Sequence, residues 1–305
     1  MSDLKIGFIG LGYMGEGMAK NLVRKGYPLW VKGNRNRAPV DTLVGMGATE
    51  VATAAELART CDIIHLCLSN SAQVEGIFHG EDGLLEGARP GLTVIDCTTA
   101  DPTSTASLAA SLAEAGGTFV DAPLGRTPKE AEAGTLDCMV GCDDATFARI
   151  KPVIECWAGN ITHVGPTGSG HKMKLLMNFI SMGYAALYAE ATVLGAAVGI
   201  PPAKVRQVIG SSRLTNGFFD TFMTYAVDRD CVHKFTISNG AKDVRYVNAM
   251  ADGEGLMTIM AGAIKQYFAH VEASGNGGDF VPLLTDHVGR LNGIDMAKAA
   301  RAADD

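Results

Sequence analysis

Residues 5–15 of the 305-residue chain, KIGFIGLGYMG, decide the fold. The run KIGFI is short and apolar, as buried β-strands are, and a helical pattern follows from residue 14 to residue 25. Glycines between them have the spacing G-x-G-x-x-G. In a strand–turn–helix context the first glycine permits a tight turn, the second lets a pyrophosphate approach the backbone, and the third lets helix and strand pack closely. The stretch predicts a dinucleotide site, and a purely structural glycine turn is the alternative. The candidate cofactor contacts are Gly10, Gly12, Tyr13, Met14 and Gly15.

The end of the second expected strand, residues 28–32, indicates which dinucleotide binds. A fold specific for NAD usually places a carboxylate about 20 residues after the glycine turn, where it accepts a hydrogen bond from the ribose. This chain has KGNRNR at residues 32–37 and no carboxylate there before Asp41. Three cations and two amides suit a 2′-phosphate. The sequence therefore predicts NADP(H) over NAD(H), with a solvated basic loop as the alternative.

The rest of the chain has two parts of different character. Up to about residue 165, helical stretches alternate with short β-rich runs at residues 62–68, 92–96, 118–122, 136–140 and 161–164. This alternation predicts an α/β domain with a doubly wound parallel sheet and helices on both faces. Later stretches are long and rich in Ala, Leu and Met, which predicts an all-α domain. At about 150 residues per domain, we expect a dinucleotide-binding domain at residues 1–165 and a helical substrate and dimerisation domain at residues 166–305.

A second group of polar residues follows Gly168. His171, Lys174, Asn178 and Ser181 recur at spacings of three, four and three, so they share one face of a predicted helix. Most of the remaining circumference is apolar, which predicts a buried helix whose polar stripe lines a cleft; an amphipathic helix with that stripe in water is the alternative. A lysine in a partly dry cleft suits proton transfer near neutral pH, so Lys174 is the candidate general acid and base. Asn178, one turn later, is the candidate that holds the ammonium or a substrate hydroxyl.

Composition argues against several classes of function. Lys and Arg number 26 against 33 Asp and Glu, a net charge of −7, so no global basic field favours nucleic acid or anionic lipid. The seven cysteines form no C-x-x-C pair and no two histidines have zinc-site spacing, so we expect reduced thiols and no metal. Residues 181–200 are the most apolar stretch, but Glu190 interrupts them, so we expect a buried helix and no membrane span. The first residues lack the features of a signal peptide, and we expect a cytoplasmic protein.

Four motifs, in order, resemble those of the β-hydroxyacid dehydrogenases, the family of 3-hydroxyisobutyrate dehydrogenases and tartronate semialdehyde reductases. They are GFIGLGYMG at residues 7–15, DAP at 121–123 leading to GTL at 134–136, G-x-G-x-x-x-K-x-x-x-N at 168–178, and KD at 242–243. The resemblance covers essentially the whole chain. Four motifs in family-like order are far more specific than the glycine turn alone.

The resemblance implies an N-terminal Rossmann domain, a long interdomain helix, an all-α C-terminal domain and a homodimer or homotetramer. It also implies reversible hydride transfer between a nicotinamide and the carbinol carbon of a small hydroxy acid or aldehyde. Lys174 then protonates the alkoxide in reduction and takes that proton in oxidation. The family pattern implies further cofactor contacts, with Leu68 and Thr99 at the nicotinamide, Lys242 nearby, and Asn34 and Arg35 where members prefer NADP.

The chain departs from the family pattern in the loop that binds the substrate. Carboxylate-binding members have Ser-Gly-Gly after the DAP run and one further residue, whereas this chain has Gly125, Arg126 and Thr127 there. Arginine offers a charged fork of donors for an oxyanion with several acceptors, and Gly-Arg-Thr is similar to the loop of the sulfolactaldehyde reductases. Ser181 is retained from these enzymes, although Met177 replaces an asparagine. We expect a small anionic substrate that carries a sulfonate or a phosphonate.

Three alternatives stay open. The substrate can be a carboxylate of the 3-hydroxyisobutyrate or tartronate semialdehyde type. Arg126 can form a surface salt bridge, to Glu130 or Glu132. The chain can also be a non-catalytic dinucleotide-binding sensor, because a fold does not fix a function, although such a protein does not need the polar stripe around Lys174.

Overall fold

The computed structural model describes residues 4–301 and divides the chain into two compact units, Met1–Lys174 and Leu175–Asp305. Sequence features put the boundary earlier, at residue 165. The first unit extends further because the backbone N–H groups of Gly168 and His171 donate hydrogen bonds to Asp121, which ties the first turn of helix α9 (Ser169–Ala197) to the sheet.

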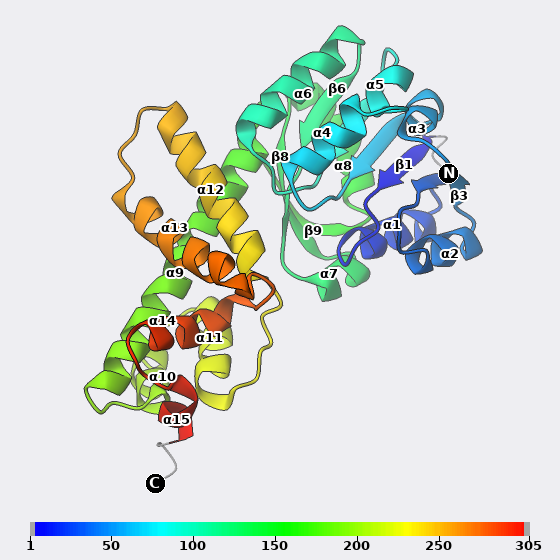
Figure 1. The fold of residues 1–305 in the computed structure, drawn as a ribbon. Coiled ribbons are helices and arrows are strands. Elements are labelled where there is room, and N and C mark those ends of the chain that lie inside the picture. Colours follow the sequence, from blue (N-terminus) through cyan, green and yellow to red (C-terminus); the bar gives the residue numbers. More distant parts are fainter. Residues whose placement is uncertain (1–3, 302–305) are drawn as a thin grey trace. The chain divides into compact units, whose positions relative to one another are not determined.

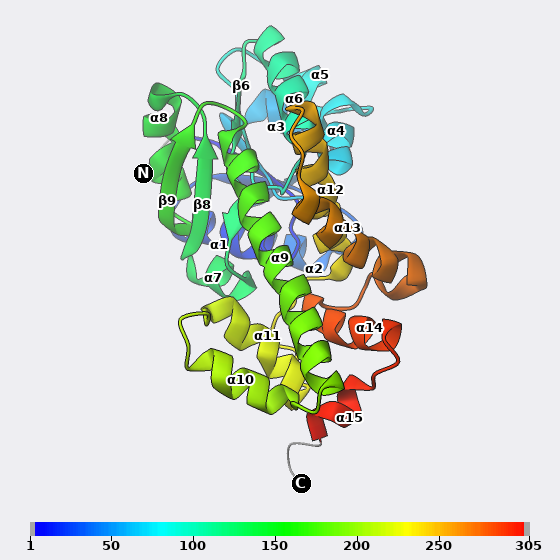
Figure 2. The ribbon, with the colours of Figure 1, turned by 90° about the vertical axis from the view of Figure 1, so that its left-hand side faces the viewer.

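A nine-stranded sheet forms the middle of the first unit in the described part of the chain (Figure 1 and Figure 2). The strands are β1 Ile6–Ile9, β2 Leu29–Lys32, β3 Thr49–Val51, β4 Ile63–Leu66, β5 Thr93–Asp96, β6 Thr118–Asp121, β7 Leu124–Gly125, β8 Leu136–Gly141 and β9 Ala158–Gly165. Their order is β3-β2-β1-β4-β5-β6-β8-β7, with β9 beside β8. Strands β1 to β6 are parallel, whereas β8 runs antiparallel to β6 and β7.

Helices cover both faces of this sheet. Residues 4–168 contain α1 Gly15–Arg24, α2 Ala38–Gly45, α3 Ala54–Thr60, α4 Ser71–His79, α5 Leu84–Gly87, α6 Pro102–Glu114, α7 Pro128–Ala133 and α8 Asp144–Ile154. One apolar core joins the sheet to α1, α2 and α8, through Leu22, Val40 and Ile150 among others. The other core joins the sheet to helices that include α3 and α4, through Leu57 and Phe78. The central strands β1, β4 and β5 are buried at every residue, which explains why they are mostly apolar.

The predicted fold class is confirmed, and each β-rich run that the sequence indicates contains a strand. Two strands were not predicted, β3 and β7, and the antiparallel direction of β8 was not predicted either. With three and two residues, β3 and β7 are too short to show an apolar alternation. Both find hydrogen-bond partners because longer strands lie beside them.

Helices and no strands form the regular structure of the second unit among the residues that the structure describes there, as predicted, apart from one isolated β-bridge between Thr236 and Phe280. It contains most of α9 and then α10 Pro202–Gly210, α11 Gly217–Asp228, α12 Ile237–Gly253, α13 Ile259–Val271, α14 Leu284–Leu291 and α15 Met296–Arg301. A π-helical turn, Glu272–Asn276, and a 3-10 turn, Val281–Leu283, connect α13 to α14. Met182 of α9, Phe222 of α11 and Phe268 of α13 belong to a single apolar core.

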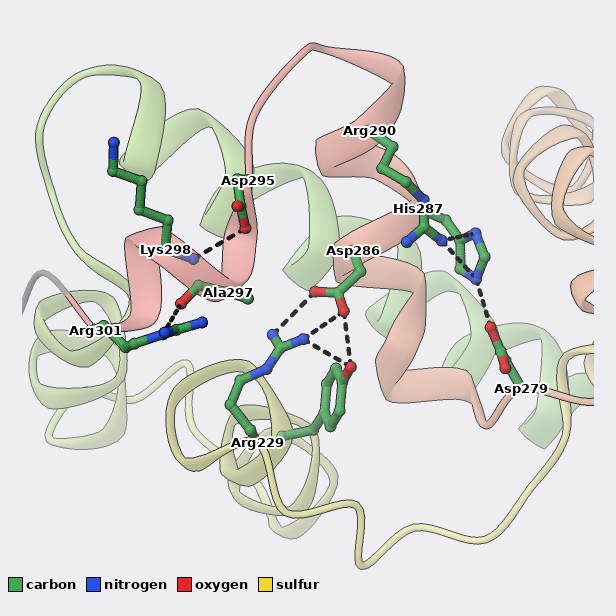
Figure 3. Close-up of polar contacts among 10 residues, drawn as sticks. Arg229, Asp279, Asp286, His287, Arg290, Asp295, Ala297, Lys298 and Arg301 are labelled. Carbon is green, nitrogen blue, oxygen red and sulfur yellow. Dashed lines mark hydrogen bonds and ion pairs between the residues drawn. The ribbon is translucent and has the colours of Figure 1, made fainter.

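A clasp of polar side chains joins α11 to α14 (Figure 3). The guanidinium of Arg229, which follows α11, binds the carboxylate of Asp286, and the hydroxyl of Tyr225 donates to the same carboxylate over 2.7 Å. On α14, His287 lies 2.9 Å from Asp279, and Arg290 donates to His287. These contacts hold the last helices of the second unit against its core.

Helix α9 is not buried all around, which contradicts the expectation from its composition. Ile180, Leu187 and Leu194 are 54%, 59% and 65% exposed. By length and composition alone α9 is apolar enough to cross a membrane, and 44% of its most apolar 18-residue window is buried inside the protein. Composition alone could not reveal that one apolar face of α9 is exposed.

Candidate active site

The glycine turn between β1 and α1 has two structural glycines and one that the fold does not require. Gly10 has φ +98°, and a side chain there would collide with the carbonyl of Cys67. A side chain at Gly15 would collide with the carbonyl of Gly10. Gly12, by contrast, has open space around the position of a Cβ atom. That space, next to the N-terminus of α1, is where a pyrophosphate is predicted to lie.

The other predicted contacts of the turn differ in exposure. Tyr13 is 91% exposed. Met14 occupies the N-cap of α1 and forms no side-chain hydrogen bond there. The first N–H groups of a helix have no partner within the helix, so those of α1 suit an anionic ligand.

In the basic loop after β2, some side chains form hydrogen bonds or ion pairs within the protein, and others are exposed. Arg37 donates from Nη1 and Nη2 to the two carboxylate oxygens of Glu50, over 2.5 and 2.8 Å. This ion pair holds the pKa of Glu50 below its ordinary value. Asn36 accepts a hydrogen bond from the backbone of Ala38. Asn34 and Arg35 are both exposed, and they stay the predicted contacts of a 2′-phosphate.

The loops after β1, β4 and β5 meet at the carboxyl edge of the sheet. The backbone N–H of Leu68 donates to the hydroxyl of Thr98 over 3.0 Å, and the N–H of Thr98 donates to Asp96 over 2.9 Å. A Cβ atom at Gly10 would be 3.1 Å from Leu68. The structure therefore brings Leu68 and the Thr98–Thr99 pair to the glycine turn, at the edge where doubly wound sheets bind their ligands.

The substrate loop contains a strained arginine. Arg126 follows β7 and has φ +76°, in the left-handed region that favours glycine. Its Nε lies 2.9 Å from Oδ1 of Asp137 on β8, and this contact raises the pKa of Arg126. Of the two salt-bridge partners proposed from sequence, Glu130 and Glu132, neither forms this bridge. The partner is Asp137 because β7 and β8 pair antiparallel, with Gly125 opposite Asp137.

Thr127 caps the helix that follows the loop. Its backbone N–H and its hydroxyl both donate to Glu130, and its hydroxyl accepts from the N–H of Lys129 over 3.3 Å. This capping box fixes the start of α7. A substrate contact from the hydroxyl of Thr127 would therefore compete with the cap.

The glycines before Lys174 position the start of α9. Asp121, at the end of β6, accepts hydrogen bonds from the N–H groups of Gly168 and His171 over 2.6 and 2.7 Å. A Cβ atom at Gly170 would lie 2.9 Å from the carbonyl oxygen of Asp121 and would collide with the carbonyl of Met139 on β8. The motif G-x-G thus lets the helix backbone dock directly on two strands, which fixes the first turn of the helix that carries Lys174.

His171 is fully buried and does not share the exposure of the rest of its stripe. Its Nδ1 lies 2.7 Å from the hydroxyl of Thr105, and its Nε2 lies 3.9 Å from Asp96. Burial raises the pKa of Asp96 above its ordinary value. Asp96 and Asp121 were overlooked as structural anchors of this region. In the sequence each is a carboxylate at the end of an expected strand, and Asp121 is also the first residue of the DAP motif.

The rest of the stripe continues along α9. Lys174 is half-buried, and Asn178 follows one turn later. Nδ2 of Asn178 donates to Oδ2 of Asp243 over 2.6 Å, and Nζ of Lys242 lies 3.1 Å from Oδ1 of the same carboxylate. Asp243 is 1% exposed, so it is a buried link between two predicted site residues. Ser181 donates to the backbone carbonyl of Asn178, within its own helix.

Asp243 also decides how the amide of Asn178 is oriented. An ionised carboxylate only accepts hydrogen bonds, so the amide nitrogen of Asn178 faces Asp243 and its oxygen faces away. The amide oxygen is therefore the end that can accept from an ammonium or from a substrate hydroxyl. Sequence alone named Asp243 only as the second residue of a motif.

Comparison with known proteins places the chain in a family. A model of the NAD-binding domain of 6-phosphogluconate dehydrogenase matches residues 5–165, and a model of the NAD-binding domain of NADP-dependent 3-hydroxyisobutyrate dehydrogenase matches residues 168–285. The 2-hydroxy-3-oxopropionate reductase of Escherichia coli K12 is 32% identical over 273 residues, which are 89% of this chain and 92% of that enzyme. The chain belongs to the β-hydroxyacid dehydrogenases.

Two further β-hydroxyacid dehydrogenases extend the comparison. The 3-sulfolactaldehyde reductase of Escherichia coli K12 is 31% identical over 89% of this chain and 91% of its own length. The structure of a 3-hydroxyisobutyrate dehydrogenase from Salmonella typhimurium superposes with a TM-score of 0.81 at 26% identity, over 93% of this chain and 99% of that one. This β-hydroxyacid dehydrogenase is therefore an oxidoreductase that acts on CH–OH groups with a pyridine nucleotide.

Proposed function

We propose that this enzyme transfers a hydride between NADP(H) and a small aldehyde or β-hydroxy anion that carries a sulfonate or a phosphonate. The observation that carries the substrate class is Arg126. It occupies a left-handed backbone conformation, with φ +76°, where carboxylate-binding members have glycine. Such conformations cost about 1 to 3 kcal/mol and cluster at functional sites. An arginine retained at that cost supports a role in binding an oxyanion.

The proton in this reaction moves through Lys174. When bound, the nicotinamide supplies or accepts the hydride at the carbinol carbon. In reduction, Nζ of Lys174 donates a proton to the alkoxide oxygen, and in oxidation it takes the proton from the hydroxyl. The amide oxygen of Asn178 accepts from that ammonium or from the hydroxyl, because Asp243 holds the amide nitrogen.

The preference for NADP(H) is supported by the residues after β2. Asn34 and Arg35 are exposed at the position that follows this strand, where the ribose binds in doubly wound folds. Gly12 leaves open space at the N-terminus of α1 for the pyrophosphate.

Initial rates test both specificities at once. The purified enzyme is mixed with NADPH or NADH and with matched short aldehydes that carry a sulfonate, a phosphonate or a carboxylate. Fast loss of NADPH with a sulfonate or a phosphonate is the expected result. A preference for the carboxylate contradicts the substrate proposal, and a preference for NADH contradicts the cofactor proposal, each independently.

A carboxylate substrate is the second candidate. The enzyme named 2-hydroxy-3-oxopropionate reductase is as similar to this chain as the sulfolactaldehyde reductase is, at 32% and 31% identity. The ion pair of Arg126 with Asp137 would then serve the β7–β8 pairing alone. The rate comparison above distinguishes the two substrate classes.

We also propose a cytoplasmic homodimer or homotetramer. The exposed apolar face of α9, formed by Ile180, Leu187 and Leu194, supports self-association. The cytoplasmic assignment is supported by the seven cysteines, all within the described residues and all free thiols. Cell fractionation of the tagged full-length chain tests the compartment.

A further inference from the structure

No acidic residue directly follows β2, but the neighbouring strand β3 places the carboxylate of Glu50 there. β3 pairs parallel with β2, and Glu50 lies opposite Val31. The carboxylate of Glu50 reaches the residue that follows β2, since a Cβ atom at Gly33 would be only 2.9 Å from its Oε1. In doubly wound folds a carboxylate at this place accepts from the ribose 2′-hydroxyl and favours NAD. An ionised Glu50 therefore opposes the binding of a 2′-phosphate.

Arg37 is positioned to neutralise the charge of the Glu50 carboxylate. It makes two parallel hydrogen bonds to Glu50, at 2.5 and 2.8 Å, and a third contact to Asp41 at 3.3 Å. Its Nη1 would be 2.8 Å from a Cβ atom at Gly33, so the ion pair packs directly against the end of β2. A glycine at residue 33 is what lets the pair approach this closely. Both side chains are partly exposed, 51% for Arg37 and 34% for Glu50, so the ion pair is accessible to a ligand from solvent.

We propose that Arg37 and Glu50 together set the choice between NADP(H) and NAD(H), with Arg37 acting through Glu50 as a positioning residue. Arg37 neutralises the carboxylate of Glu50 and holds it against Gly33, so that Glu50 does not repel the 2′-phosphate. When Arg37 is absent, Glu50 repels the phosphate and is free to accept from the 2′-hydroxyl of NAD(H). This inference rests on the proposed preference for NADP(H).

Binding of cofactors to Arg37→Gln tests the proposal. Dissociation constants for NADPH and NADH are measured by fluorescence, together with those of 2′,5′-ADP and 5′-AMP as probes of the phosphate alone. Repulsion between two charges at partly screened distances predicts that the preference for NADPH over NADH falls about tenfold. The loss shrinks as salt is added.

The double variant Arg37→Gln/Glu50→Gln separates an indirect role from a direct one. If Arg37 acts by cancelling Glu50, removing both charges restores the preference for NADPH to within about twofold of the original. Arg206→Gln is the matched control, because Arg206 forms a similar exposed ion pair with Asp228 over 2.5 Å in the second unit. That variant leaves both dissociation constants unchanged.

Each contrary result has a distinct meaning. A double variant as weak for NADPH as Arg37→Gln would mean that Arg37 contacts the phosphate itself, which overturns the indirect role. An unchanged preference in Arg37→Gln overturns the inference while the preference for NADP(H) stands. A wild-type enzyme that binds NADH more tightly and ignores 2′,5′-ADP overturns the proposed cofactor, and the inference with it.

Discussion

At the scale of single residues, Arg126 is the position where local conformation and chemistry conflict. Only three non-glycine residues among those described have positive φ, and Arg126 is one of them. Its ion pair with Asp137 is half-exposed, and such pairs contribute little to stability. Stability therefore does not explain the arginine, which supports the proposed role of Arg126 in recognising an anion.

Arg126→Gly removes the proposed contact with the anion and relieves the strain of the backbone. We expect the Michaelis constant for the anionic substrate to rise by about one to two orders of magnitude, as for loss of a charge-assisted contact. The free energy of unfolding does not fall, because glycine adopts this φ without strain. Steady-state kinetics and thermal unfolding measure the two effects. An unchanged Michaelis constant would mean that Arg126 only forms the surface ion pair with Asp137 and does not bind the substrate.

In the proposed mechanism Lys174 carries the proton transfer, so Lys174→Ala is expected to separate catalysis from binding. General acid–base catalysis contributes about 10²- to 10⁴-fold, and we expect kcat to fall by that factor while the dissociation constant for NADPH changes little. Lys172→Ala is the control, since Lys172 lies two residues away on another face of α9 and is exposed. Single-turnover absorbance at the nicotinamide band gives the rates. A variant at Lys174 with near-normal turnover contradicts the assignment.

At the scale of elements, the start of α9 depends on backbone contact with the sheet. Gly170→Ala places a methyl group against the carbonyls of Asp121 and Met139, which cannot move without breaking strand pairing. We expect a loss of about 1 to 3 kcal/mol in the free energy of unfolding, as for overpacked cores, and a lower kcat because the turn before Lys174 shifts. Chemical denaturation and kinetics check both.

Gly12→Ala is the complementary variant, because Gly12 has room for a side chain in the protein itself. It leaves the free energy of unfolding nearly unchanged and weakens NADPH binding, since the added methyl group occupies the space predicted for the pyrophosphate. Equal destabilisation by both alanines would show that the two glycines do not differ in role.

The sequence predicted those elements whose information is local. The apolar run before Gly10 and the spacing of the three glycines predicted β1 and α1 correctly. β3 and β7 were not predicted, since strands this short exist only through pairing with a neighbour. Arg37 and Glu50 are 13 residues apart and meet because β2 and β3 are parallel.

In the candidate site, too, local features were predicted correctly and contacts between distant segments were not. Helical spacing put His171, Lys174 and Asn178 on one face, but it could not show that the first turn is covered by the sheet, which buries His171. The predicted salt-bridge partners of Arg126 were wrong for a similar reason. Glu130 and Glu132 are closer in sequence, whereas Asp137 is brought opposite the loop by the antiparallel β7–β8 register.

At the scale of the whole molecule, the exposed apolar face of α9 is the feature that a single chain leaves unexplained. Ile180, Leu187 and Leu194 recur at intervals of seven residues, so they form one stripe along the helix. Exposed apolar stripes rimmed by polar residues mark association sites. In the proposed oligomer, a second copy of the chain packs against this face of α9.

Leu187→Lys/Leu194→Lys places two positive charges on that stripe and tests whether it holds copies together. Burying an unpaired charge in an apolar interface is strongly unfavourable, so we expect the variant to have the mass of one chain, 31.9 kDa, by light scattering, where the wild type has a multiple of it. The helical circular dichroism stays the same, because both side chains face solvent within the chain. Val208→Lys is the control, since Val208 is 66% exposed on α10, outside the stripe. A wild-type monomer, or a variant at Leu187 and Leu194 that keeps the wild-type mass, would mean that this face of α9 is not where the copies meet.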